Sequence, residues 1–407
     1  MQIFLNALRN PSEAEVLKGF ISKSPFSLSD SIDEADCMVI VTGDSITKEL
    51  TDLQEYHKPT VIAACFNEAN TLEMRRVFPY ASFLSFEHCD EVISVVEETI
   101  QGNSIELISR DGIPSISPRM RDSTAVSYLP LTDGCSEFCE TCSQRSEQGT
   151  LISYPGETIQ KEIDSSSKEC AELHLVGPDI ASFETSTIWR SSLPEIISEI
   201  SSRTKARIVL GRMMPKNVMP IRDELMNIYS QPKVIKKLWL PFLAGSQRKL
   251  SLIGYDYGLD DIKYFVLALQ QKYRISLKTE FILGPNETAE DFDKDLSLLR
   301  ELCPDEILIR MRSNSEEFMQ RKKLMESIHT NIVRMQDEKW IGWKGESFVL
   351  AKAQKGWIVR NAFGKEFLVK ASLEIGMDIP IMCTRRSDRQ LIAEVIGMEK
   401  IAPLGLS

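Results

Sequence analysis

Between residues 120 and 335, six short apolar segments alternate with helical patterns, and this alternation constrains the fold more than any other feature. The segments read AVSYLPL, AELHLVG, ARIVLGRM, KLWLPFL, SLKTEFILG and DEILIRM. Runs of this length are typical of buried strands, and the amphipathic segments 258–273 and 288–302 between them are typical of helices. Because strands that alternate with helices form parallel sheets, we predict an open, partial (β/α)6 barrel. Its ligand site should lie at the carboxyl ends of the strands.

Two smaller regions flank this one. Residues 1–105 contain the strand-like runs MQIFLNA, CMVIVTG and TVIAACF between helical patterns, which predict a small α/β domain. A connector with proline, glycine and serine follows at 110–124. Residues 338–400 carry short alternating strands punctuated by glycine, which is typical of a small all-β barrel. We therefore expect an α/β protein with three domains, at 1–105, 120–335 and 338–400.

The composition argues against several classes of protein. The chain has no run of eighteen apolar residues, so we expect no transmembrane helix, and its start lacks the features of a signal peptide. We expect a cytoplasmic protein, in which thiols stay reduced. The net charge of −11 argues against a surface covered with nucleic-acid-binding groups. In residues 338–400, however, seven lysines and four arginines outnumber eight acidic residues, so nucleic acid would be expected to bind there.

Three of the nine cysteines, Cys135, Cys139 and Cys142, follow the first strand of the central region. Thiolates are ligands of iron–sulfur clusters and of zinc. A structural zinc site needs four ligands, and no fourth cysteine or histidine lies nearby in the sequence. A four-iron cluster on three cysteines would keep one iron open to a substrate, and Gly134 would allow the sharp turn before the first ligand. Inert buried thiols, or a zinc site completed by a distant residue, are the alternatives.

The spacing C-x₃-C-x₂-C after the first strand of a six-stranded partial barrel resembles radical S-adenosylmethionine (SAM) enzymes. The segment GCSEFCETCSQRSEQGTLISYPGETIQKEI is similar to the methylthiotransferase branch, closest to the archaeal and eukaryotic members that act on N6-threonylcarbamoyladenosine in tRNA. AELHLVGPDIASF, VLGRMMPKNV, KLWLPFLAGSQRKL and TEFILGPNETAEDF also resemble segments of that family. Residues 338–400 are similar to a TRAM domain, an RNA-binding module. The resemblance covers nearly the whole chain.

The resemblance implies a set of cofactors and partners. The three cysteines would hold one [4Fe–4S] cluster, whose open iron would bind SAM for cleavage to a radical. The substrate would be a tRNA adenosine, and the reaction would need an electron donor such as ferredoxin or flavodoxin. A protein partner is also compatible with the acidic charge.

Five residues at the ends of the predicted strands are candidate SAM contacts: Gly177, Asp179, Arg212, Ser246 and Gly284. A glycine lets a nucleoside approach the backbone. Asp179 and Ser246 offer partners for ribose or amino groups, and Arg212 could pair with the carboxylate of SAM. Each polar side chain could instead cap a strand end or form a surface ion pair. The sequence indicates no catalytic residue.

The N-terminal region departs from the family pattern. The resemblance implies a second cluster there, held by three further cysteines, but the matching positions are Ala7, Gly43 and Cys65. One thiolate cannot hold a four-iron cluster. Three functions therefore stay open: a divergent tRNA methylthiotransferase with another source of sulfur, a SAM-radical RNA enzyme with a different reaction such as methylation, or a non-catalytic RNA-binding paralogue or partner subunit.

Aromatic and basic residues are mixed in the last region. They are Trp340, Trp343, Lys344, Trp357, Arg360 and Lys365. Such residues can stack on bases and bind phosphates. At least half of the aromatic ones are expected to lie in the core of the barrel instead.

Overall fold

The computed structural model describes residues 1–8, 10–43, 46–66, 68–109, 114–121, 125–134, 151–166, 170–183, 192–313, 315–388 and 390–397. The chain divides into two compact units. The N-terminal unit comprises residues 1–122 with the short pieces 133–136 and 142–162, and the C-terminal unit comprises the remainder. The predicted α/β fold is confirmed, while the expected boundaries of three separate domains stay a prediction.

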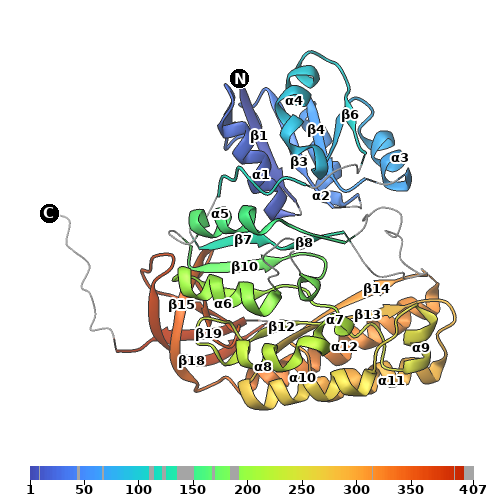
Figure 1. The fold of residues 1–407 in the computed structure, drawn as a ribbon, viewed down its shortest axis with the longest axis vertical. Helices are drawn as coiled ribbons and strands as arrows, with labels where there is room; N and C mark the ends of the chain where they lie inside the picture. Colours follow the sequence, from blue (N-terminus) through green and yellow to red (C-terminus); the bar gives the residue numbers. More distant parts are fainter. Residues whose placement is uncertain are drawn as a thin grey trace. The chain divides into compact units, whose positions relative to one another are not determined.

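The N-terminal unit is built on a parallel sheet between two layers of helices (Figure 1). Its elements are β1 (Gln2–Ala7), α1 (Pro11–Ser22), β2 (Ser27–Ser29), β3 (Cys37–Val41), α2 (Lys48–Asp52), η1 (Leu53–Tyr56), β4 (Thr60–Ala64), α3 (Glu68–Val77), β5 (Ser82–Ser85), η2 (Phe86–Glu91), α4 (Val92–Ile100) and β6 (Glu106–Leu107). The strands lie in the order β2-β1-β3-β4-β5-β6. The three strands predicted in this region are confirmed as β1, β3 and β4.

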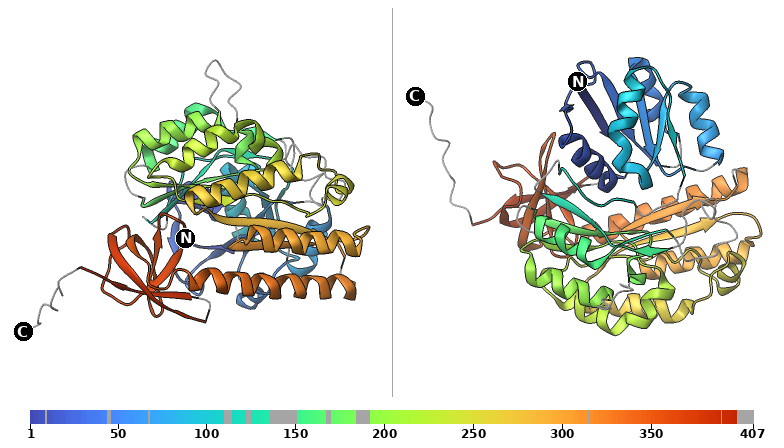
Figure 2. Two further views of the ribbon diagram at one scale, coloured as in Figure 1. Left: turned by 90° about the horizontal axis from the view of Figure 1, so that it is seen from below. Right: turned by 45° about the horizontal axis from the view of Figure 1, so that its top comes forward.

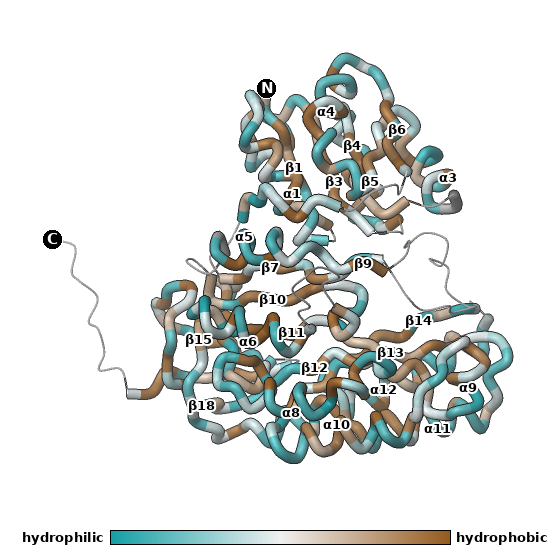
Figure 3. The backbone as a smooth tube through the Cα atoms, in the orientation of Figure 1, coloured by the Kyte–Doolittle hydropathy of each residue, from teal (hydrophilic) through white to brown (hydrophobic). Residues whose placement is uncertain are grey.

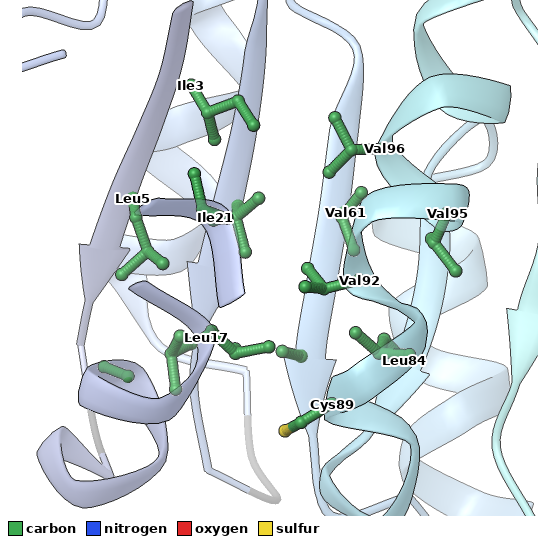
Figure 4. Close-up of a cluster of buried hydrophobic side chains, with 14 of the residues drawn as sticks. Ile3, Leu5, Leu17, Ile21, Val61, Leu84, Cys89, Val92, Val95 and Val96 are labelled. Atoms are coloured by element: carbon green, nitrogen blue, oxygen red, sulfur yellow. The ribbon is translucent and has the colours of Figure 1, made fainter. Parts of the chain in front are cut away.

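Both faces of this sheet are covered. Successive side chains of a strand point to opposite faces. Val61 and its like-facing neighbours pack with residues of α1 and α4 (Figure 4), whereas Met38 and Ile40 pack on the other side with residues of α2 and α3. Every position of β3 and β4 is therefore buried, as expected for parallel strands between helices.

The C-terminal unit contains six parallel strands, as predicted. They are β7 (Val126–Pro130), β10 (Glu172–Val176), β11 (Arg207–Leu210), β12 (Lys237–Trp239), β13 (Ser276–Leu283) and β14 (Glu306–Met311). They form two three-stranded sheets, β7-β10-β11 and β12-β13-β14. Parallel bridges from Ile208 to Val234 and from Arg212 to Trp239 join β11 to β12. The strands thus follow one another in chain order, which is the arrangement of a half-barrel.

Helices follow most of these strands, and hydrophobic residues concentrate along the strands (Figure 3). The remaining elements before the C-terminal barrel are β8 (Thr132–Asp133), β9 (Ile152–Ser153), α5 (Gly156–Ser166), η3 (Ile180–Ser182), α6 (Leu193–Arg203), α7 (Pro215–Val218), η4 (Met219–Ile221), α8 (Arg222–Ser230), α9 (Gln247–Leu252), α10 (Leu259–Tyr273), α11 (Ala289–Leu302) and α12 (Glu316–Glu338). A capping box between Thr288 and Asp291 begins α11. No helix in the described part of the chain is long and apolar enough to cross a membrane.

The last region is a closed β-barrel, as predicted (Figure 2). Its strands are β15 (Lys344–Ala353), β16 (Gly356–Asn361), β17 (Glu366–Val369), β18 (Asp378–Ser387) and β19 (Gln390–Val395). They close in the order β15-β16-β17-β19-β18. Trp340, Trp343 and Trp357 pack against the barrel core, and the Trp343 ring stacks on Phe367. At least half of these aromatic residues were expected within the core; the structure shows all three partly buried on its outside.

The barrel packs against the amino-terminal ends of the half-barrel strands. Phe348 and Leu350 of the barrel form an apolar cluster with Val209 and Ile235, and Val126 at the start of β7 lies against it. The Arg207 guanidinium at the start of β11 lies over the Phe348 ring, 4.0 Å from its centre. The carboxyl ends of the same strands are thereby left for the candidate site.

Buried ion pairs reinforce this contact. The carboxylate of Glu172, at the start of β10, is fully buried and accepts hydrogen bonds from Arg360 of the barrel and from His174. Asp337 of α12 pairs with Lys365 at 2.7 Å. Arg360 and Lys365, considered above as phosphate contacts, therefore hold the barrel to the half-barrel.

We predict that Arg360→Met lowers the free energy of unfolding by about 3 kcal/mol, because the variant leaves the buried Glu172 carboxylate with an incomplete set of partners. Denaturant unfolding of the full chain measures this change. Lys352→Met, at an exposed barrel position, is the matched control and should change stability by less than about 0.5 kcal/mol. Equal effects of the two substitutions would contradict the role given to Arg360.

Candidate active site at the carboxyl ends of the strands

The predicted cluster ligands Cys135, Cys139 and Cys142 lie outside the described residues. The chain is described up to Gly134, which follows β7 and β8. The φ angle of Gly134 is 74°, in the left-handed region that favours glycine, and its amide donates to Asp133 Oδ1 at 2.8 Å. A sharp turn therefore precedes the first cysteine, as the sequence predicts. Among the described residues, no group of three or more His, Cys, Asp or Glu side chains is arranged to hold a metal ion.

The positions expected to match a second cluster lie at the carboxyl ends of three neighbouring strands of the N-terminal sheet. Ala7 ends β1 and is in register with Val41 of β3; Gly43 follows two residues later, and Cys65 follows β4 directly. The side chains present there supply one thiol, so they do not fit a four-iron cluster.

Two other thiols of the N-terminal unit belong to its core. Burial raises the pKa of the Cys37 thiol to about 12 and raises that of Cys89 as well. Cys89 packs among the apolar residues shown in Figure 4. Both thiols are therefore explained as buried members of the apolar core.

Gly177 and Asp179 follow β10 and have structural partners. A Cβ on Gly177 would lie 2.3 Å from Thr132 Oγ1, so this position requires glycine. The buried Asp179 carboxylate accepts hydrogen bonds from the amides of Ala181 and Met214 and from Asn217 Nδ2, at 2.6–3.1 Å. Burial raises the pKa of Asp179 despite these bonds. Asp179 thus joins the ends of β10 and β11, and its contact with SAM stays a prediction.

Arg212 is held by a carboxylate that the sequence reasoning missed. Glu280 of β13 is fully buried and accepts hydrogen bonds from Arg212 Nε at 2.7 Å, Trp239 Nε1 at 3.0 Å and Arg310 Nε at 2.9 Å. Arg212 also donates to the Pro178 carbonyl at 2.8 Å. Glu280 therefore connects β11, β12, β13 and β14 on one face of the sheet.

The charge of Glu280 depends on these neighbours. Burial alone would raise its pKa, but the guanidinium of Arg212, followed by that of Arg310, outweighs burial and keeps the pKa below its ordinary value. A glutamate within an apolar strand was the available signal, because a buried carboxylate requires charged or hydrogen-bonding partners. Its partners lie on other strands, so the sequence did not identify them.

Ser246 caps α9. Its hydroxyl accepts from the Lys249 amide at 3.1 Å and donates to Asp291 Oδ1 at 2.6 Å. The Lys249 ammonium is itself buried and pairs with Asp295 and Glu287. Burial raises the pKa of Asp295 to about 6, against the opposing effect of Lys249. Ser246 is thus engaged within the protein, and a SAM contact from it stays a prediction.

Gly284 ends β13 at a close contact between strands. A Cβ there would lie 2.6 Å from the Cβ of Arg312, which follows β14. Gly284 and Arg312 line a small cavity of about 50 Å³ together with Asn286 and Glu287. The cavity adjoins the strand ends, where the sequence predicts the nucleoside of SAM.

A basic cleft lies on the C-terminal barrel. It has a volume of about 540 Å³, and its charged lining residues are Lys355, Lys370, Arg385 and Asp388. The three cations are exposed, and no ion pair holds them within the described part of the chain. They were not among the basic residues singled out from the sequence.

We predict that Glu280→Gln lowers the free energy of unfolding by about 3 kcal/mol at neutral pH, because two guanidinium groups lose their buried counter-charge. Since the pKa of Glu280 is lowered from 4.5 in the folded state, this stabilisation is complete above about pH 4.5 and is lost as the pH falls through the folded-state value. Denaturant unfolding at several pH values measures both effects.

Glu290→Gln is the matched control, since Glu290 is exposed and forms a surface pair with Lys294 in α11. Its cost should stay below about 0.5 kcal/mol. A loss in Glu280→Gln that is no larger than this, or that does not shrink in acid, would contradict the assignment.

Comparison with known proteins gives relatives over most of the chain, although no family model matches it. The "Probable threonylcarbamoyladenosine tRNA methylthiotransferase" of Methanothermobacter thermautotrophicus is 26% identical over 378 residues, covering 86% of this chain and 88% of that protein. The protein of the same name from Archaeoglobus fulgidus is 26% identical over 311 residues, covering 73% and 72%. The "Threonylcarbamoyladenosine tRNA methylthiotransferase" of Drosophila melanogaster is 24% identical over 310 residues, covering 71% and 55%.

Solved structures share the fold. The radical SAM methyltransferase TsrM from Kitasatospora setae, determined with cobalamin and a [4Fe–4S] cluster, has a TM-score of 0.55 at 11% identity and covers 76% of this chain and 74% of its own. The cobalamin-dependent SAM radical enzyme OxsB has a TM-score of 0.50 at 11% identity, covering 83% and 61%. The resemblance to methylthiotransferases predicted from the sequence is confirmed by the curated relatives, and the fold class by these structures.

Proposed function

We propose that this chain, a homologue of the threonylcarbamoyladenosine tRNA methylthiotransferases, is a radical SAM transferase that modifies an adenosine of tRNA. The observation that carries the proposal is the three-cysteine motif placed directly after the first of six consecutive parallel strands. In such sheets, ligands bind at the carboxyl ends of the strands. Relatives named as probable threonylcarbamoyladenosine tRNA methylthiotransferases match most of the chain.

The donor set suits one [4Fe–4S] cluster on Cys135, Cys139 and Cys142, because three thiolates leave one iron for SAM. The bound cluster and SAM supply radical chemistry. The protein's own residues would shape the site: Asp179 joins the ends of β10 and β11, and Glu280 fixes the Arg212 guanidinium beside it. Gly177 and Gly284 would shape the strand ends by allowing the close approach of Thr132 and Arg312, and Ser246 would order the following turn.

The second cluster that the resemblance implies is not proposed for this chain. Of its three matching positions, Ala7 and Gly43 cannot bind iron, and Cys65 supplies one thiol. This observation favours a second candidate function, in which the SAM radical modifies RNA without inserting sulfur. Methylthiolation by this chain would require sulfur from another source, such as a partner protein.

The tRNA would contact the basic cleft of the barrel, where Lys355, Lys370 and Arg385 could neutralise phosphates. An electron donor such as ferredoxin or flavodoxin would reduce the cluster, and the cytoplasm would keep the thiols reduced. The acidic remainder of the chain would suit a protein partner better than a second RNA surface.

We predict about four irons per chain after anaerobic reconstitution, because only one complete set of cluster ligands is present. Iron analysis and the reductive cleavage of SAM to 5′-deoxyadenosine measure the loading and its chemistry. Cys139→Ala should lose both, whereas Cys383→Ala, at a buried barrel position, is the thiol control and should keep both. About eight irons per chain would contradict the single cluster, and a loaded chain that cleaves no SAM would indicate a non-enzyme.

We predict that tRNA from cells lacking the gene loses the methylthio derivative of N6-threonylcarbamoyladenosine. Mass analysis of tRNA nucleosides measures this product, which the wild-type gene should restore and the Cys139→Ala gene should not. If this nucleoside persists while another modified adenosine disappears, the second candidate function replaces the first. An unchanged set of nucleosides would contradict both.

A further inference from the structure

The Arg310 guanidinium has a fixed orientation, and its Nη1 and Nη2 groups can still donate to a ligand. It lies in β14, and its side chain is 47% exposed. Its Nε donates to Glu280, which holds the plane of the group. No acceptor within the described ranges bonds to Nη1 or Nη2. An arginine held in this way presents two parallel N–H groups, which match a carboxylate in a bidentate pair.

The neighbouring cations are more fully engaged. Arg212 is 19% exposed and uses Nε for Glu280 and Nη1 for the Pro178 carbonyl. The Lys278 ammonium pairs with Glu306 and lies 4.0 Å from the centre of the Trp239 ring. Of Arg212, Lys278 and Arg310, Arg310 is therefore best placed to bind a ligand.

The charges around Glu280 also favour an anion beside Arg310. Toward the amino ends of the strands, Lys237 and Lys278 share the Glu306 carboxylate. Closer to the carboxyl ends, Arg212 and Arg310 share the Glu280 carboxylate. Two guanidinium groups on one buried carboxylate leave this trio of side chains with a positive charge, which matches a negatively charged ligand group.

We propose that Arg310 binds the carboxylate of a threonylcarbamoyl group on the substrate adenosine, and that Glu280 positions it for this contact. The inference rests on the function proposed above. A threonylcarbamoyl substituent ends in a free carboxylate, which distinguishes it from plain adenosine and from adenosines with neutral substituents. A bidentate, charge-assisted contact of this kind discriminates against a ligand that lacks the charge.

The test compares three RNA stem-loops that carry N6-threonylcarbamoyladenosine, its carboxamide derivative, or plain adenosine. Fluorescence anisotropy measures their binding to the full chain with its cluster reconstituted. Wild-type protein should bind the carboxylate form about tenfold more tightly than the carboxamide. Arg310→Gln should lose this preference with unchanged affinity for plain-adenosine RNA, and Arg310→Lys should keep part of it.

Arg300→Gln is the matched control, because Arg300 is an exposed arginine on α11 and should keep the full preference. Persistence of the preference in Arg310→Gln would overturn the inference. The inference would also be overturned if Arg310→Gln lowered only the affinity for S-adenosylhomocysteine. Arg310 would then bind the carboxylate of the cofactor.

The inference and the proposed function can fail separately. If wild-type protein modifies the carboxylate and carboxamide RNAs equally and binds them equally, the inference is wrong and the function stands. If wild-type protein prefers the carboxylate form in an Arg310-dependent way but cleaves no SAM, the inference stands and the function is wrong.

Discussion

The buried carboxylate of Glu280 is the interaction on which the half-barrel depends. A carboxylate removed from water is costly unless charged or hydrogen-bonding groups replace the solvent. Here the ends of β11, β12 and β14 each supply one donor, through Arg212, Trp239 and Arg310. The same requirement that fixes the strand ends in place therefore gathers positive charge at the edge where a ligand is expected. The contacts of Glu280 thus stabilise the half-barrel and also position the cations of the candidate site.

The elements of the fold could be predicted because their signals are local. Alternation of apolar runs and amphipathic segments identified the parallel strands, and glycine-punctuated alternation identified the barrel. The roles of individual polar residues could not be predicted in the same way. Asp179 and Ser246 were located at the strand ends, but their partners in the structure come from distant parts of the chain. Glu280 was missed because Arg212 lies 68 residues and Arg310 lies 30 residues from it in sequence.

The N-terminal unit illustrates the opposite case. A family resemblance predicted three positions from motifs far apart in the sequence, and the sheet brings Ala7, Gly43 and Cys65 to neighbouring strand ends. The sheet therefore places the three matching positions together, although two of them carry residues that cannot bind iron. The buried core beneath them, which includes Cys37 and Cys89, forms without those ligands.

The contact of the barrel with the amino-terminal ends of the strands sets its distance from their carboxyl ends. The eight residues of β13 span about 26 Å, at about 3.3 Å per residue. Because Glu172 and Asp337 anchor the barrel at one end, this length separates it from the edge where a base would react. An RNA that contacts both the barrel and this edge would then have to span a fixed distance. Selection of the molecule by its folded dimensions would be separate from selection of the base by its chemical groups.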